Sequence, residues 1–179
     1  AANLVQELKK RERYASLYDV FTESDAFPQR VMHHDAKIAN VLFDEDTGQV
    51  LCPVDLDTVM PGYFFSDLGD MIRTMTCPAI EESVDLSGIH IRAEYYDALI
   101  DGYQESMNHT LTDAEQTYLH HAGLLMTCMQ SLRFLTDYLN GDIYYQTTYP
   151  EQNFDRAQNQ FTLLHNLETF LKQKFRIGE

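Results

Sequence analysis

The sequence predicts a mainly helical α+β domain with one small β-hairpin in its N-terminal third. Two short apolar segments, residues 41–43 and 50–54, flank a polar turn that contains a glycine, which is typical of a hairpin. Most later segments carry apolar residues at helical spacing. With 179 residues, 44% of them hydrophobic and 12% aromatic, the chain can bury one core of ordinary domain size. We therefore expect a single domain over residues 1–179.

The N-terminal part is expected to form one helix, then extended chain, then the hairpin. Apolar residues lie among charged ones over residues 1–19, which indicates a helix, and the polar run 22–25 ends it. Pro28 favours extended chain, because the residue before a proline avoids the helical conformation. In the hairpin turn, residues 44–49, Gly48 supplies the positive φ that a tight reversal needs.

The remainder reads as helices with recognisable ends. One apolar stripe follows the spacing i, i+3, i+4, i+7 and i+11, at Tyr96, Leu99, Ile100, Tyr103 and Met107. Thr112 and Glu115 have the spacing of a capping box, which predicts a helix from there to about Leu139. Gly141 provides a left-handed stop. A last helix is expected after Pro150.

Charge and cysteine usage exclude several classes of partner. The chain has 13 basic and 28 acidic residues and a net charge of −15, which disfavours binding to nucleic acid or to anionic membranes. No apolar run approaches the length of a membrane span. The three cysteines have neither metal-site nor disulfide spacing, which favours a reducing, cytoplasmic location.

The residues that indicate chemistry lie between positions 33 and 57. His33, Asp35 and Asn40 form the pattern H-x-D-x-x-x-x-N, and the hairpin that follows leads directly to Asp55 and Asp57. This order places Asp35, Asn40 and Asp55 around the mouth of one hairpin. Phosphoryl transfer needs such groups: a carboxylate that accepts the proton of the attacking hydroxyl, and a carboxylate with an amide oxygen that hold Mg²⁺ against phosphates.

These motifs resemble those of the aminoglycoside-phosphotransferase and choline-kinase superfamily, and within it those of the N-acetylhexosamine 1-kinases. The matching segments are residues 33–43, 54–62, 67–73, 133–142 and 149–151. The resemblance implies the C-terminal (large) lobe of a protein-kinase-like phosphotransferase, with the small hairpin beside the catalytic loop. It also implies ATP as co-substrate, Mg²⁺ as cofactor, and transfer of the γ-phosphate to the anomeric hydroxyl of an N-acetylhexosamine.

The resemblance assigns roles to the residues of the first motif and to the aspartate after the hairpin. It makes Asp35 the catalytic base and His33 a buttress of the catalytic loop. Asn40 and Asp55 become the metal ligands that contact the nucleotide phosphates. Lys37 stands two residues after the base, and from its charge and spacing we expect a cation near the transferred phosphate.

The resemblance also implies a sugar site. Arg133 and Tyr144 fall where these kinases contact the sugar, whereas Asp57 is able to face either the metal or the substrate. Other interpretations stay open: a surface cation for Arg133 and a packing role for Tyr144. Structural roles are expected for the remaining polar residues, namely an ion-pair and capping group of Asp67, Asp70 and Arg73, and ordinary helix or loop positions for His34, His120 and His121.

The segment before the catalytic loop departs from the family pattern. Such kinases have an N-terminal lobe with a nucleotide-covering loop and a lysine that holds the phosphates. The 32 residues before His33 contain no G-x-G-x-x-G. We therefore expect this chain to be the C-terminal lobe without the nucleotide-binding lobe, and to be inactive by itself. An apolar face near the hairpin would then be exposed and would favour self-association.

Two other functions fit parts of the sequence. Asp55 and Asp57 satisfy D-x-D-x-[TV], the signature of haloacid-dehalogenase-type phosphatases, in which Asp55 would be the nucleophile. That fold requires this motif on the first strand of a parallel sheet. The other possibility is a non-catalytic, kinase-like interaction or regulatory fragment, which Mg²⁺-dependent nucleotide binding would distinguish from an enzyme.

Overall fold

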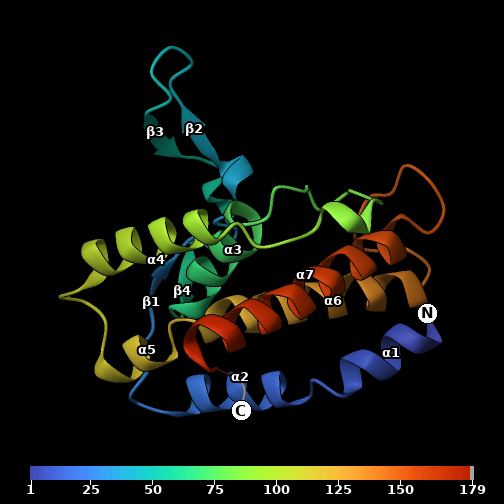
Figure 1. The fold of residues 1–179 in the computed structure, drawn as a ribbon, viewed down its shortest axis with the longest axis horizontal. Coiled ribbons are helices and arrows are strands. Elements are labelled where there is room, and N and C mark those ends of the chain that lie inside the picture. The colour runs from blue at the N-terminus through green and yellow to red at the C-terminus, as the bar shows by residue number, and fades with distance from the viewer. Residues whose placement is uncertain (178–179) are drawn as a thin grey trace.

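The computed structural model describes residues 1–177 and has a helical body from which one β-hairpin projects (Figure 1). The helices are α1 (Ala2–Lys9), α2 (Arg13–Glu23), α3 (Phe65–Met75), α4 (Ala93–Met107), α5 (Asp113–Tyr118), α6 (His121–Leu139) and α7 (Gln152–Phe175). The predicted mainly helical α+β class is confirmed. Within residues 1–177, no helix has both the length and the apolar character needed to cross a membrane.

Two small antiparallel sheets frame the segment that carries the sequence motifs. Strands β2 (Val41–Phe43) and β3 (Val50–Pro53) form the predicted hairpin. Strands β1 (Arg30–Met32) and β4 (Met60–Gly62) form a second pair. The sequence did not predict this pair, because its two strands are far apart along the chain and no tight turn joins them. The second pair brings the two ends of this segment together, so the residues between them form one compact loop region.

Two helices that were expected to be continuous are interrupted. The helix predicted over residues 1–19 is α1 followed by α2, with a turn at residues 10–12. Arg11, in that turn, donates to Glu168 of α7 at 2.8 Å. The helix predicted from Thr112 to Leu139 is α5 followed by α6, and His120 at the junction lies 2.8 Å from the hydroxyl of Tyr96. In both places contacts with distant helices accompany the break.

The core lies where α3 and α7 pack against α6 (Figure 1). Gly69 of α3 permits the close approach: a Cβ there would lie 2.6 Å from the carbonyl oxygen of Ala122 on α6. On α6, Met126 is buried, whereas Leu132 lies at the surface. Helix α3 therefore packs closely against α6, and it carries four of the polar residues discussed below.

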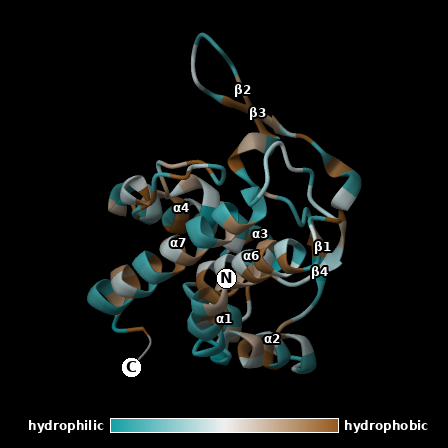
Figure 2. Cartoon of the chain, turned by 90° about the vertical axis from the view of Figure 1, so that its right-hand side faces the viewer, coloured by the Kyte–Doolittle hydropathy of each residue, from teal (hydrophilic) through white to brown (hydrophobic). Residues whose placement is uncertain are grey.

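The hairpin presents the expected apolar surface. Leu42, Phe43, Val50 and Leu51 are all exposed, and Figure 2 shows apolar colouring on both of its strands. The exposed face that the sequence predicted is thus present, and self-association through it stays a prediction.

Candidate functional site

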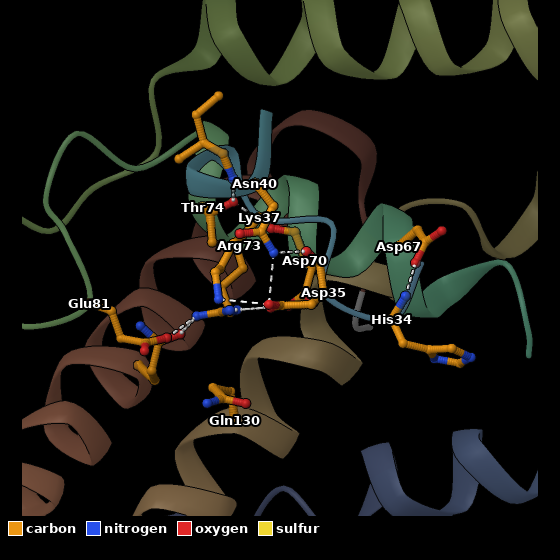
Figure 3. Close-up of polar contacts among 12 residues, drawn as sticks. His34, Asp35, Lys37, Asn40, Asp67, Asp70, Arg73, Thr74, Glu81 and Gln130 are labelled. Atoms are coloured by element: carbon orange, nitrogen blue, oxygen red, sulfur yellow. Dashed lines mark hydrogen bonds and ion pairs between the residues drawn. The ribbon is translucent and has the colours of Figure 1, made fainter. Parts of the chain in front are cut away.

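Residues 33–40, the predicted catalytic loop, are held by the first turn of α3. One carboxylate oxygen of Asp67 accepts the backbone N–H of His33 at 2.8 Å, and the other accepts that of His34 at 2.8 Å (Figure 3). Because both oxygens are used, the carboxylate fixes the direction of the chain just before Asp35. Asp67 therefore does not join the ion pair expected for it, but anchors the loop.

His33 connects this loop to the chain that follows the hairpin. Its Nε2 lies 2.9 Å from the carbonyl oxygen of Val54, the residue before Asp55. The hydroxyl of Thr58 donates to the carbonyl oxygen of His33 at 2.6 Å. These contacts hold the two halves of the site together, which is the arrangement that a buttressing role requires. His34, with φ of 65° and its Nδ1 2.8 Å from the hydroxyl of Ser66, packs against α3 as an ordinary loop residue.

Asp35 is held by two side chains of its own loop. Its Oδ2 accepts from Lys37 Nζ at 2.7 Å and from Asn40 Nδ2 at 2.8 Å (Figure 3). Asn40 is buried, while the Asp35 side chain keeps 28% of its surface exposed. Burial lowers the pKa of Lys37, whereas the negative charges of Asp35, Glu81 and Asp55 raise it by a larger amount. The pKa of Lys37 is therefore raised overall, and its ammonium stays charged. The carboxylate is thus oriented and still accessible.

Asp55 and Asp57 come directly after the hairpin in the sequence. Asp55 has a left-handed backbone, with φ of 63°, and Asp57 lies in the 3₁₀ turn Leu56–Thr58. Both are exposed. The N–H of Val54 donates to the carbonyl oxygen of Asn40 at 2.9 Å, which joins the two metal-ligand candidates through the backbone.

The donor set fits a magnesium ion held mainly by phosphates. The amide nitrogen of Asn40 points to Asp35, which leaves its amide oxygen as a ligand, and Asp55 supplies one carboxylate. Mg²⁺ typically takes one or two carboxylates and keeps phosphate oxygens or water for the rest. In the described part of the chain, no cluster of three or more His, Cys, Asp or Glu side chains is arranged to hold a metal by itself.

A buried ion pair lies beneath the catalytic loop. Arg73, with 5% of its side chain exposed, pairs with Asp70 at 3.2 Å and with Glu81, and it also donates to Gln160 at 3.3 Å. Burial raises the pKa of Asp70, although Arg73 opposes the shift. The pair of Asp70 and Arg73 was predicted, whereas Glu81 and Gln160 come from distant segments and were not. Figure 3 shows this group beside Asp35.

Arg133 and Tyr144 lie together in a shallow cavity of about 440 Å³. The guanidinium carbon of Arg133 is 5.8 Å from the ring centre of Tyr144 and 5.5 Å from that of the neighbouring Tyr145. The hydroxyl of Tyr145 lies 3.5 Å from the side-chain nitrogen of Gln130, and Figure 3 places Gln130 below the group around Asp35. Gln130 thus lies between this cavity's Tyr145 and the group around Asp35 in this view.

A larger groove of about 770 Å³ opens beside Lys37. Its walls come from the end of α3, the segment 76–92, α4 and α7, with Arg92 and Tyr95 on one side. This groove was not predicted from sequence patterns, because segments that are distant from one another along the chain form it.

The phosphatase alternative is contradicted by the strand arrangement. Asp55 follows β3, and β3 pairs only with β2, antiparallel, in a two-stranded sheet. The haloacid-dehalogenase motif needs the first strand of a parallel sheet, and both sheets in residues 1–177 are antiparallel.

A helical lobe with an oriented aspartate, an asparagine and a second aspartate around one hairpin is the arrangement of a kinase-type phosphotransferase. Residues 1–110 match the phosphotransferase enzyme family APH. Because the match covers more than half of the 179 residues, the chain belongs to this family. The matched part includes the catalytic loop, Asp55 and α3, whereas Arg133 and Tyr144 lie beyond it.

Proposed function

We propose that this protein, expressed from its complete natural reading frame, transfers the γ-phosphate of ATP to the anomeric hydroxyl of an N-acetylhexosamine. The observation that carries the proposal is the setting of Asp35: Lys37 and Asn40 orient its carboxylate, and the backbone of Asn40 is hydrogen-bonded to Val54, the residue before the metal-ligand candidate Asp55. The APH family supports the phosphotransferase class. The choice of sugar rests on the resemblance of the motifs and on the cavity that contains Arg133 and Tyr144.

In the proposed reaction, Asp35 accepts a hydrogen bond from the sugar 1-hydroxyl and takes its proton as the oxygen attacks. The bond from that oxygen to the γ-phosphorus forms while the bond to the β–γ bridging oxygen breaks, and ADP leaves. Lys37 lies close enough to the carboxylate to neutralise charge on the transferred group. Asn40 and Asp55 would hold Mg²⁺, which supplies positive charge to the phosphates when bound.

Sugar recognition is assigned to the cavity between α6 and the loop that follows it. Arg133 is exposed, and its guanidinium has five N–H donors for hydroxyl or carbonyl oxygens. Tyr144 is 73% exposed and offers a ring face for the apolar side of a sugar. Both face the same space, so one ligand is able to contact both.

The metal assignment predicts weak binding of Mg²⁺ alone. Because Asn40 and Asp55 supply only two protein ligands, calorimetric titration without nucleotide should give a dissociation constant in about the millimolar range. Asp55→Ala should abolish the Mg²⁺-dependent part of ATP binding. Glu45→Ala, in the exposed hairpin turn, removes the same charge and should change nothing. A tight, nucleotide-independent site at Asp55 would contradict the assignment.

The sugar assignment predicts a selective effect of Arg133→Ala. The KM for the sugar should rise by an amount equivalent to about 1.5–3 kcal/mol, the range for hydrogen bonds to charged groups. The KM for ATP should stay nearly constant, because Arg133 is not expected to touch the phosphates. Steady-state kinetics with each substrate varied in turn provides the test. Weaker ATP binding instead would place Arg133 in a structural role.

A further inference from the structure

The carboxylate of Asp137 is fully occupied by the loop that follows α6. Its Oδ1 accepts the backbone N–H of Ile143 at 3.0 Å and of Tyr144 at 2.8 Å. Its Oδ2 accepts the N–H of Tyr145 at 2.9 Å and the side-chain amide of Asn153 at 2.9 Å. Three consecutive backbone amides and one buried amide of α7 thus converge on a single side chain.

The position of Asp137 is unfavourable for a negative charge for two reasons. It lies in the last turn of α6, where the helix dipole disfavours negative charge, and it is 6% exposed. Burial raises the pKa of Asp137, but the three backbone amides lower it by more, so the net shift is downward. The group is therefore ionised at neutral pH. Its stabilisation comes from the loop amides, which in turn are held by the carboxylate.

The loop that Asp137 holds is the wall of the cavity proposed for the sugar. Asp137 and Arg133 are four residues apart on α6, so they share one face of the helix. The chain reverses through Gly141, with φ of 90°, and then brings Tyr144 and Tyr145 over the Arg133 guanidinium. Because Tyr144 is largely exposed, packing does not fix its ring, and the backbone of residues 143–145 must do so.

We propose that Asp137 is a positioning residue that sets the sugar specificity of this enzyme by holding residues 143–145 over Arg133. The inference rests on the proposed function, because it takes this cavity as the sugar site. Asp137 itself has no role in the chemistry, since its oxygens are occupied by the loop and by Asn153.

The structural half of the proposal is tested by hydrogen exchange, which needs no activity. Asp137→Asn replaces one accepting oxygen with an NH₂ group that cannot accept a backbone N–H. The amides of residues 143–145 should then exchange about tenfold faster, the effect of losing about one hydrogen bond. Asp142→Asn is the matched control: Asp142 lies in the same loop with φ of 57°, which asparagine tolerates. Its Oδ1 accepts from Asn153 at 2.9 Å, and the amide oxygen of asparagine is able to accept the same bond. That control should leave the exchange of residues 143–145 unchanged.

The role in sugar specificity is tested by steady-state kinetics with the protein expressed from its complete natural reading frame. In Asp137→Asn the KM for the N-acetylhexosamine should rise about tenfold, while kcat and the KM for ATP stay within about twofold. If Asp137→Asn does not fold, Asn153→Ser removes one donor from the same carboxylate. It should give a smaller change of the same kind.

The outcomes separate this inference from the proposed function. Unchanged exchange in residues 143–145 overturns the positioning role. Faster exchange with an unchanged sugar KM overturns the role in specificity. A wild-type protein that phosphorylates no sugar overturns the proposed function and with it the specificity role, and the exchange data still decide whether Asp137 holds the loop.

Discussion

Replacing Asp35 with asparagine is expected to lower kcat by about 10² or more, the usual contribution of a general base. The amide of asparagine cannot take the proton of the attacking hydroxyl. It keeps the shape of the side chain and one oxygen that accepts a hydrogen bond from Lys37 or Asn40. The KM values for sugar and ATP should therefore change little. Steady-state rates with both substrates saturating give kcat directly.

A matched variant shows whether the loss is specific. Asp46→Asn makes the same chemical change in the exposed hairpin turn and should leave kcat unchanged. Near-normal turnover in Asp35→Asn would remove Asp35 from the mechanism. A large rise in the KM for ATP with constant kcat would instead make it a nucleotide-binding residue.

The largest effect on stability is expected for Arg73→Met, which should lower the free energy of unfolding by about 3–5 kcal/mol, the cost of breaking a buried ion pair. Methionine fills similar space but leaves Asp70 buried without its counter-ion, and it frees Glu81 and Gln160. Urea denaturation followed by circular dichroism measures the change. With an ordinary stability of about 5–15 kcal/mol, the variant should still fold at low temperature.

An exposed pair provides the contrast. Lys10 and Glu7 form a salt bridge in which the Lys10 side chain keeps 67% of its surface exposed. Lys10→Met should leave the free energy of unfolding nearly unchanged, because solvent screens such pairs. A loss below about 1 kcal/mol in Arg73→Met would contradict the structural role of Arg73, because breaking a buried pair costs more than that.

Features that depend on local sequence were predictable. The hairpin followed from apolar segments around a turn with Gly48, and the capping box of Thr112 and Glu115 has both of its hydrogen bonds. The catalytic loop was located by the spacing of Asp35 and Asn40, and the structure brings their side chains within 2.8 Å. These elements are set by neighbours a few residues apart, so pattern and turn chemistry suffice.

Features that depend on distant partners were not predictable. Asp67 anchors His33 across 34 residues, and Arg73 reaches Gln160 across 87. The breaks in the two long helices coincide with contacts to other helices, which local propensity does not include. From the sequence alone, Asp137 has the pattern of an ordinary surface residue at the end of a helix. The chain reversal at Gly141 directs the backbone N–H groups of three loop residues toward its carboxylate.

The most direct test of the central claim is the identity of the product. The protein from its complete natural reading frame is incubated with Mg²⁺, ATP and N-acetylglucosamine or N-acetylgalactosamine, and ³¹P NMR identifies where phosphate is attached. We expect ADP and the sugar 1-phosphate in equal amounts, and almost none of either with Asp35→Asn. Phosphate on another hydroxyl would contradict the assigned acceptor. Mg²⁺-dependent ATP binding without any transfer to sugar would contradict the enzyme and favour a non-catalytic, kinase-like protein.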